Sequence, residues 1–273
     1  MHNWRVWVGR VIGAGLISAG AILLGAGPPD TWPWLVRLFG PPRMVASEAH
    51  DAAGRARVDR GALDALLREH VRDGVVDYPA IGADPRLAAY LEVVANAPWD
   101  ELSRDAKLAL AINAYNAFTL ALILDHAPLT SIKDIPAPQR WDAARWSFAG
   151  RTVSLSQLEH EELRGNFIEP RIHFAINCAS VGCPPLRSEA YDPERLEAQL
   201  EDQSRALHAH PRWLRIDGRT VQLTKLYAWY AEDFDPSGAE PLAYPARWAP
   251  QLLEGDWSVA WLDYDWSLNG PSP

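Results

Sequence analysis

The chain has 273 residues, of which 48% are hydrophobic and 22% charged, and this composition is typical of a globular protein with a sizeable core. Its formal net charge is −9, and no run of Lys or Arg interrupts the acidic balance. The composition therefore excludes nucleic acid as an expected partner, because phosphate binding needs concentrated basic side chains.

The N-terminal segment, residues 1–44, differs from the rest of the chain. Arg5 and Arg10 precede the uncharged stretch Val11–Gly27, which is the pattern of an export signal. Trp32 and Trp34 continue the apolar sequence, and Trp favours the membrane interface. We therefore predict a signal or membrane anchor over residues 1–44, either retained or cleaved near residue 26.

The positions of the positive charges predict the orientation of the chain. Positive residues before a span remain on the cytoplasmic side, so the remainder is expected to be extracytoplasmic, and periplasmic in a Gram-negative cell. Residues 45–57 are small and polar, which predicts a linker. Residues 58–273 show no sign of two independent cores, and we expect one globular domain there.

Hydrophobic periodicity predicts the elements of this domain. Helices are expected near residues 63–71, 87–94, 103–124 and 192–207, and strands at 172–177 and 259–264. Residues 146–158 and 213–226 resemble each other, since each alternates around a glycine and then meets a helix N-cap candidate, Ser156 or Thr224. Each is predicted to form a β-hairpin, and we interpret their likeness as shared hairpin chemistry in preference to a true repeat.

These elements define the expected fold class. It is α+β, a single mixed domain of helices and antiparallel hairpins behind an N-terminal signal anchor. A papain-like or transglutaminase-like core is one architecture that this order of elements, together with a cysteine and histidines, suggests by analogy.

Two asparagines interrupt the long apolar helix expected at 103–124. Asn113 and Asn116 lie three residues apart, so both face the same side of the helix. A buried amide must be hydrogen-bonded, either to a catalytic group or to the backbone of a neighbouring segment. We slightly favour the structural role, and keep Asn113 as a residue that could orient a catalytic base.

The most distinctive segment is Arg171–Leu186, which contains both cysteines. Cys178 follows the strand expected at 172–177, and Ser180 lies in the small-residue loop after it. A thiol at a strand end can serve as a nucleophile when a base accepts its proton. His173 is close in sequence, but in a strand its side chain would point away from that of Cys178.

His160 is therefore the preferred base. It lies in the first turns of the helix expected after Ser156, next to Glu159. Glu159 stands three residues after Ser156, the spacing of a capping box, so it either caps the helix or orients His160.

The cysteines allow three interpretations. Cys178 is a nucleophile, or Cys178 and Cys183 form a disulfide, or both join His160 and His173 around zinc. We favour the nucleophile and assign no metal and no cofactor.

Several stretches resemble the family known as domain of unknown function 547, and together they run from about residue 57 to the C-terminus. They are Val71–Tyr78, Leu110–Leu120, Leu158–Arg164, Arg171–Leu186, Leu226–Phe234 and Tyr264–Asn269. Ala111 departs from the family pattern, where a bulky aromatic residue is expected. The resemblance implies no agreed activity, and some bacterial members are similar in being exported. It directs attention to the motif positions Glu159, His160, Arg171, His173, Cys178 and Cys183.

We therefore expect an extracytoplasmic cysteine-dependent hydrolase or acyltransferase that acts on a peptide-like amide or thioester. Cys178 would attack, His160 would transfer the proton, and Glu159 or Asn113 would orient it. Binding roles fall to Asn116, Arg171, His173, Ser180 and Cys183. The alternative is a non-catalytic envelope domain that binds a peptide or protein, with a Cys178–Cys183 disulfide.

Overall fold

Helix α6, Arg104–His126, is the longest element of the computed structural model, which describes residues 54–238 and 240–271. The side chain of Ser103 caps it by accepting the Ala106 N–H. Every residue from Lys107 to Ile123 is buried, so other elements cover the helix on all sides. Among the described residues α6 is the one helix long and apolar enough to cross a membrane, and it forms the core as predicted. The predicted anchor lies outside the described residues.

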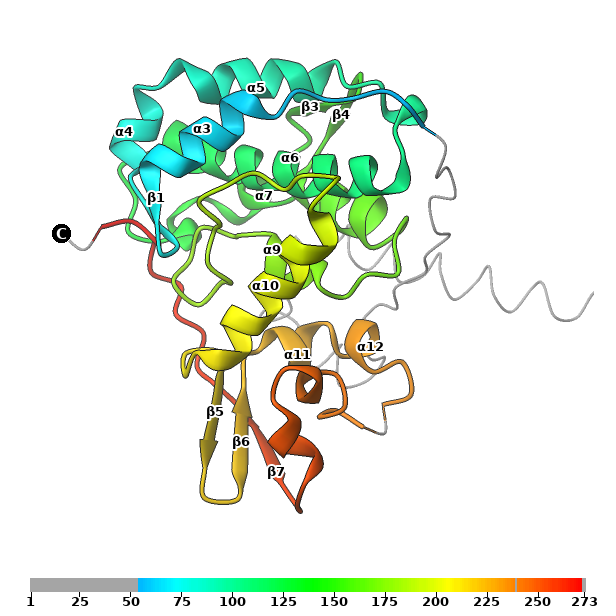
Figure 1. Cartoon of the computed structure of the whole chain (residues 1–273). Coiled ribbons are helices and arrows are strands. Elements are labelled where there is room, and N and C mark those ends of the chain that lie inside the picture. The colour runs from blue at the N-terminus through cyan, green and yellow to red at the C-terminus, as the bar shows by residue number, and fades with distance from the viewer. Residues whose placement is uncertain (1–53, 239, 272–273) are drawn as a thin grey trace, which may run out of the picture.

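Further helices surround α6 and form the upper part of Figure 1. Helices α4, α5 and α8 and a π-helical stretch contact α6, while α3 packs on α5 and α10 packs on α9. Their bounds are α3 Gly61–His70, α4 Tyr78–Gly82, α5 Pro85–Ala95, α7 Ala137–Arg140, α8 Leu155–Gln157, the π-helical stretch Leu158–Leu163, α9 Ile172–Ala175 and α10 Leu196–Ala209. Short 3-10 turns cover Trp99–Glu101, Ile132–Asp134, Pro245–Arg247 and Pro250–Leu253.

The strands form three small sheets, which together with the helices confirm the α+β class. Their bounds are β1 Val71–Arg72, β2 Val75–Val76, β3 Trp146–Phe148, β4 Arg151–Val153, β5 Leu214–Asp217, β6 Thr220–Leu223 and β7 Ser258–Trp261. Both predicted hairpins are present, as β3–β4 and β5–β6. Gly150 and Gly218 take positive φ angles of 76° and 55° in their turns. Strand β7 pairs in parallel with β6.

Two hydrophobic clusters make up the core, and α9 joins them. Ile172 and Ala175 belong to the cluster around α6. Phe174 belongs to the second cluster, which lies under β5–β7 and the short helices α11, Leu226–Trp229, and α12, Ala231–Phe234. The three apolar side chains of this one helical turn therefore hold the two parts of the core together.

The strand predicted at 172–177 is wrong. Residues 172–175 form helix α9, and Ile176 donates its N–H to the carbonyl of Ile172 as in a helix. The carbonyls that a neighbouring strand would have bonded are taken by side chains instead. Gln203 donates to the Phe174 carbonyl at 3.0 Å and Asn116 donates to the Ala175 carbonyl at 3.1 Å. Side-chain amides thus satisfy the buried backbone without a sheet.

The helix start predicted at Ser156 is also wrong. Ser154 is the N-cap of α8, and it forms a capping box with Gln157, whose side chain accepts the Ser154 N–H. Glu159 consequently has no capping role. It lies one turn further on, in the π-helical stretch, with its side chain buried.

The last described residues, 262–271, form an extended arm that returns from β7 to the α6 part of the molecule, drawn in red in Figure 1. The Val181 N–H donates to the Ser267 carbonyl at 2.8 Å and the Gly182 N–H to the Asp265 carbonyl at 2.8 Å. Asn269 donates its own N–H to the Ala179 carbonyl at 3.1 Å. The arm therefore runs alongside the loop that contains both cysteines.

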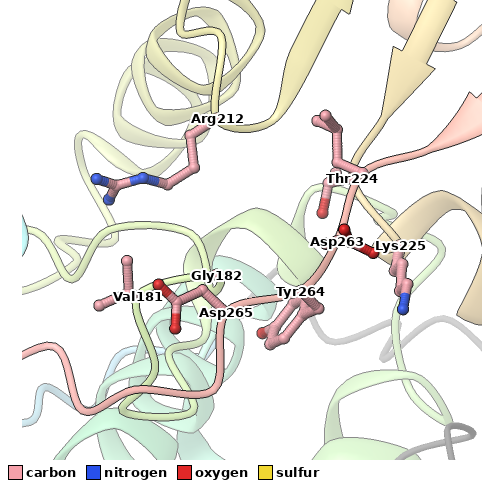
Figure 2. Close-up of a pocket in the computed structure, with 9 residues that line it drawn as sticks. Val181, Gly182, Arg212, Thr224, Lys225, Asp263, Tyr264 and Asp265 are labelled. Atoms are coloured by element: carbon pink, nitrogen blue, oxygen red, sulfur yellow. The ribbon is translucent and has the colours of Figure 1, made fainter.

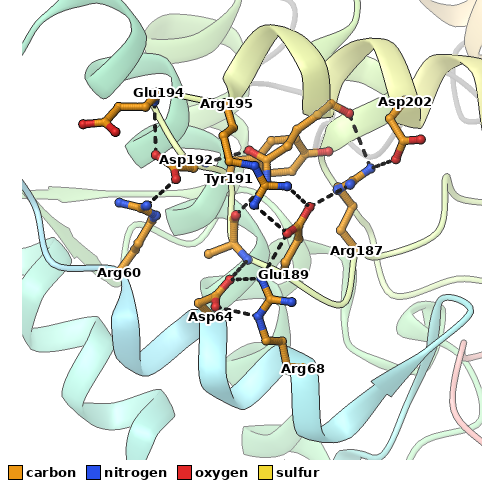
Figure 3. A network of polar contacts seen from close by, with 12 residues as sticks. Arg60, Asp64, Arg68, Arg187, Glu189, Tyr191, Asp192, Glu194, Arg195 and Asp202 are labelled. Carbon is orange, nitrogen blue, oxygen red and sulfur yellow. Dashed lines mark hydrogen bonds and ion pairs between the residues drawn. The ribbon is translucent and has the colours of Figure 1, made fainter.

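Charged side chains fasten α3 to the segment before α10 (Figure 3). Glu189 forms ion pairs with Arg68, Arg187 and Arg195 at 2.8 to 3.2 Å. Burial opposes ionisation of Glu189, but hydrogen bonds from Arg187, Gln199 and Arg195 outweigh it and lower the pKa of the carboxyl to about 2. The network holds the chain that leaves the cysteine loop, residues 176–186, against α3.

Asn113 serves the backbone of the same segment. Its amide donates to the Tyr191 carbonyl at 2.8 Å and accepts the Tyr191 N–H at 2.8 Å. Both polar groups of the asparagine are therefore occupied by one residue of the chain between the cysteine loop and α10.

Replacing Asn113 should destabilise the fold. We expect Asn113→Ala to lower the free energy of unfolding by about 1–3 kcal/mol, because the Tyr191 N–H and carbonyl lose their buried partner. Urea titration followed by far-UV circular dichroism measures the change. Asn96→Ala is the control, since Asn96 is an exposed C-cap whose amide bonds only its own helix. An equal stability of Asn113→Ala and wild type would contradict this role.

Candidate active site

The cysteine loop, residues 176–186, is held from three directions. Asn116 on α6 accepts the Asn177 N–H at 2.8 Å, directly before Cys178. Asn177 donates from its own amide to the Pro184 carbonyl at 2.7 Å and accepts the Ala179 N–H at 2.9 Å. Asn269 of the arm donates to the Asn177 side chain at 3.3 Å. Asparagine side chains therefore fix the backbone on both sides of Cys178.

Close packing against the arm shapes the loop further. Ala179, directly after Cys178, takes a φ of 61°, which is strained for a residue with a Cβ. A Cβ on Gly182 would lie 2.8 Å from the Asp265 backbone nitrogen, so only glycine fits there. Backbone strain is maintained only where the surroundings impose it, and it is frequent at functional sites.

Both cysteines are free thiols in the structure, and their surroundings differ. The sulfur of Cys178, a partly exposed residue, lies 3.0 Å from the Ser180 hydroxyl and 3.2 Å from the Tyr264 hydroxyl. Cys183 is buried, and its sulfur accepts the Cys178 N–H at 2.9 Å. The Ser180 and Tyr264 hydroxyls thus both lie within hydrogen-bond distance of the Cys178 sulfur.

These donors separate the acidities of the two thiols. Burial raises the pKa of Cys178, but hydrogen bonds from Cys183, Ser180 and Tyr264 favour the thiolate and lower the pKa to about 7. Burial and the neighbouring Cys178 sulfur raise the pKa of Cys183 well above its usual value. Burial also keeps Tyr264 protonated, since it raises the pKa of the phenol. Cys178 is therefore the more acidic of the two thiols, and it ionises near neutral pH.

A second group of polar side chains surrounds Glu159 on the π-helical stretch. Its carboxylate accepts hydrogen bonds from the Tyr230 hydroxyl at 2.6 Å and the Tyr115 hydroxyl at 3.2 Å. Burial opposes its ionisation, but His160, His173 and the Tyr230 phenol together hold the pKa of Glu159 below its usual range. Glu159 is thus a buried carboxylate, and π-helical turns often occur at functional sites.

Next to Glu159 lies a buried charge cluster centred on Asp233. Arg164 donates to both carboxylate oxygens at 2.7 and 2.8 Å. The Nε2 of His173 lies 2.7 Å from Oδ2 of Asp233, and its ring stacks on Tyr230 with 3.8 Å between ring centroids. Burial opposes the charge of Asp233, yet His173 and Arg164 lower its pKa to about 2. Asp233 is therefore ionised at neutral pH.

His173 is held in one tautomer. Asp233 accepts the Nε2–H, which leaves the lone pair on Nδ1, and Nδ1 is buried with no hydrogen-bond partner in the described part of the chain. Burial is the main reason that the pKa of His173 is lowered. A neutral imidazole oriented by a carboxylate, with its second nitrogen free, is the arrangement of a general base.

His160 has a different environment. The His160 side chain belongs to an exposed residue. Its Nδ1 lies 2.9 Å from the Arg164 guanidinium, which can only donate a hydrogen bond. The proton of the neutral ring is then on Nε2. To accept a proton at Nε2, His160 would have to give up its bond to Arg164, so the structure favours His173 over His160 as a base.

Tyr115 and Tyr230 lie between the surroundings of Cys178 and those of Glu159. Burial is the first cause that raises the pKa of Tyr115 and of Tyr230, and the charges of Glu159 and Cys178 add to it in both. The phenols that bond Glu159 are thus within electrostatic range of the Cys178 sulfur. No histidine is hydrogen-bonded to that sulfur within residues 54–238 and 240–271.

The remaining predicted site residues have structural partners. Arg171 is paired with Glu169 and Glu197 at 2.6 and 2.7 Å, which fastens α9 to α10. Asn113 bonds Tyr191, and Asn116 holds the cysteine loop. The described residues contain one group with the spacing of metal ligands, Glu69, His70 and Asp84, and Arg86 pairs with both of its carboxylates. The four groups considered for zinc are not gathered in this way.

Sequence reasoning missed five residues of this site: Tyr115, Arg164, Tyr230, Asp233 and Tyr264. All five lie inside the stretches that resemble the family. A buried tyrosine or aspartate in such a stretch was the available signal.

The comparison with protein families identifies one domain. Residues 99–207 match the family described as "Protein of unknown function, DUF547", so the chain contains a DUF547 family domain, as its motifs predicted. No curated protein and no solved structure matches the chain. The papain-like or transglutaminase-like architecture therefore stays a prediction.

Removing the Tyr264 hydroxyl should make Cys178 less acidic. In Tyr264→Phe one donor to the sulfur is lost, so we expect the apparent pKa of Cys178 to rise from about 7 toward the ordinary thiol value. The rate of alkylation by iodoacetamide, measured against pH by mass spectrometry, reports this pKa.

Tyr244→Phe is the matched control, because the Tyr244 hydroxyl is buried with no hydrogen-bond partner among the described residues. An alkylation profile of Tyr264→Phe that coincides with that of wild type would contradict the role of this phenol.

Proposed function

We propose that this protein is a cysteine-dependent hydrolase or acyltransferase that acts on a peptide-like amide or a thioester. The observation that supports it most is the setting of Cys178. Its sulfur is the partly exposed member of the thiol pair, and hydroxyl donors at 3.0 and 3.2 Å stabilise its thiolate. A low thiol pKa in a partly exposed site is what distinguishes a reactive cysteine from a structural one.

The reaction proceeds in two steps. The Cys178 thiolate attacks the carbonyl carbon, the new sulfur–carbon bond forms, and the carbon–nitrogen or carbon–sulfur bond of the substrate breaks. The leaving amine or thiol takes a proton from the imidazolium of His173, which received it from the thiol. Water, or an acceptor amine, then gives a proton to His173 and attacks the thioester, and Cys178 is released.

We assign the acid–base role to His173, with Asp233 as the group that orients it. His173 has the required tautomer, and its second nitrogen has no hydrogen-bond partner among the described residues. His160 was the base expected from the sequence, and it is retained as the competing assignment. Glu159 precedes His160 in the chain, and both histidines contribute to lowering its pKa.

A small thioester tests this proposal. We expect the N-acetylcysteamine thioester of acetate to add one acetyl group to Cys178, seen by mass spectrometry of the intact chain, with no adduct in Cys178→Ser. His173→Gln should slow the addition by roughly 10²- to 10⁴-fold, because positioned proton transfer contributes about that much. His160→Gln is the matched control and should retain most of the rate.

Other outcomes decide between the alternatives. Slower acetylation in His160→Gln alone would move the base to that residue. If neither cysteine reacts until a reductant is added, the thiols are bridged in solution, and the non-catalytic envelope domain with a disulfide replaces the enzyme.

We further propose that the domain acts outside the cytoplasm, on a chain tethered or exported through residues 1–44. The support is the pair Arg5 and Arg10 before the uncharged stretch Val11–Gly27. Alkaline phosphatase fused after residue 57 should be active in a bacterial host. Activity of a cytoplasmic reporter at the same junction, with an inactive phosphatase, would refute this placement.

A further inference from the structure

A pocket of about 150 Å³ lies beside the cysteine loop, at one end of the strands of the three-stranded sheet (Figure 2). Arg212 precedes β5, Lys225 follows β6, and Asp263 follows β7. Because β5 is antiparallel to β6 and β6 is parallel to β7, these three positions lie at the same end of the sheet. Gly182 of the cysteine loop lines the same pocket.

Tyr264 connects this pocket to the reactive sulfur. It belongs to the pocket wall, and its hydroxyl lies 3.2 Å from the sulfur of Cys178. Tyr264 is therefore shared by the pocket and by the surroundings of the reactive sulfur.

The pocket contains charges of both signs that do not pair with each other. Arg212 and Lys225 form no ion pair with any described residue, although most arginines of the described chain are paired. Asp263 and Asp265 line the same pocket; in Figure 2 the Arg212 side chain extends away from Asp263, whose carboxylate lies on the side of Lys225. Charges of opposite sign that line one pocket match a ligand that carries both.

We propose that this pocket binds a zwitterionic amino-acid or dipeptide unit of the substrate, with its carboxylate on Arg212 and its ammonium group on Asp263. A guanidinium binds a carboxylate through two parallel hydrogen bonds, which makes Arg212 the anchor for that end. The inference rests on the proposed function in one respect, that the bound unit belongs to the acyl substrate of Cys178. The binding itself requires no reaction at the thiol.

The probe is alanylalanine, titrated calorimetrically into the full-length Cys178→Ser chain in detergent micelles. We expect it to bind, and we expect its C-terminal amide and its N-acetyl form each to bind roughly threefold to fivefold more weakly, the worth of one partly exposed ion pair. Arg212→Gln should weaken the parent dipeptide by a similar factor and no longer distinguish it from the amide. Asp263→Asn should do the same for the N-acetyl form.

Arg219→Gln and Asp256→Asn are matched controls, because this exposed pair lies 3.4 Å apart on the same sheet and does not line the pocket. No binding of alanylalanine, equal binding of its three forms, or equal binding by Arg212→Gln and wild type would overturn the proposal. If Cys178 of the wild-type chain still accepts an acetyl group, the proposed function stands without this pocket. If the dipeptide binds as expected and no acetyl adduct forms, the pocket stands and the enzyme does not.

Discussion

The candidate site depends on the buried contacts that the carboxylate of Asp233 makes with Arg164 and His173. The Asp233 side chain is fully buried, and removing such a charge from water costs several kcal/mol unless good partners replace the water. Arg164 and His173 supply three short contacts from two other parts of the chain. One carboxylate on α12 thereby fixes the end of the π-helical stretch and the turn α9 in their places.

The rest of the site follows from that placement. With its ring fixed by Asp233, His173 stacks on Tyr230, and the Tyr230 hydroxyl donates to Glu159. Tyr115 of α6 reaches the same carboxylate from the other part of the core. Glu159 keeps its charge in a buried position because these donors replace its hydration. The short helices of the second hydrophobic cluster therefore serve to carry Tyr230 and Asp233 to the face of the first.

The sequence predicts the elements better than it predicts the contacts of the site. The long helix, the two hairpins and the strand near residue 259 are confirmed, because each carries its own periodicity and its own turn or cap residues. The strand at 172–177 was wrong because a short apolar run suits a buried strand and a buried helical turn equally. Asn116 and Gln203 favour the helical turn, because their side-chain amides bond the backbone carbonyls that a neighbouring strand would otherwise bond.

Long-range pairing is what the sequence could not supply. His173 and Asp233 are 60 residues apart, and Cys178 and Tyr264 are 86 residues apart. The argument that His173 points away from Cys178 depended on the predicted strand, and it no longer applies because residues 172–175 form a helix. The choice of His160 followed from setting His173 aside on strand geometry, and in the structure the partner of the His160 Nδ1 is Arg164. Cys178 itself could be found, because a thiol among small residues beside Pro184 and Pro185 is a local signal.

A disulfide sulfur and a thiolate require different residues around them. A disulfide that merely stiffens the loop would need no hydroxyl near Cys178, since a bridged sulfur carries no charge to stabilise. A thiolate needs such donors, because burial otherwise penalises it. The donors here are costly to place: Ser180 and Tyr264 meet at the sulfur only because Gly182 lets the arm approach and Ala179 accepts a left-handed backbone. Strain and close packing are thus concentrated beside the Cys178 sulfur, and this supports the proposal that Cys178 is the reactive member of the pair.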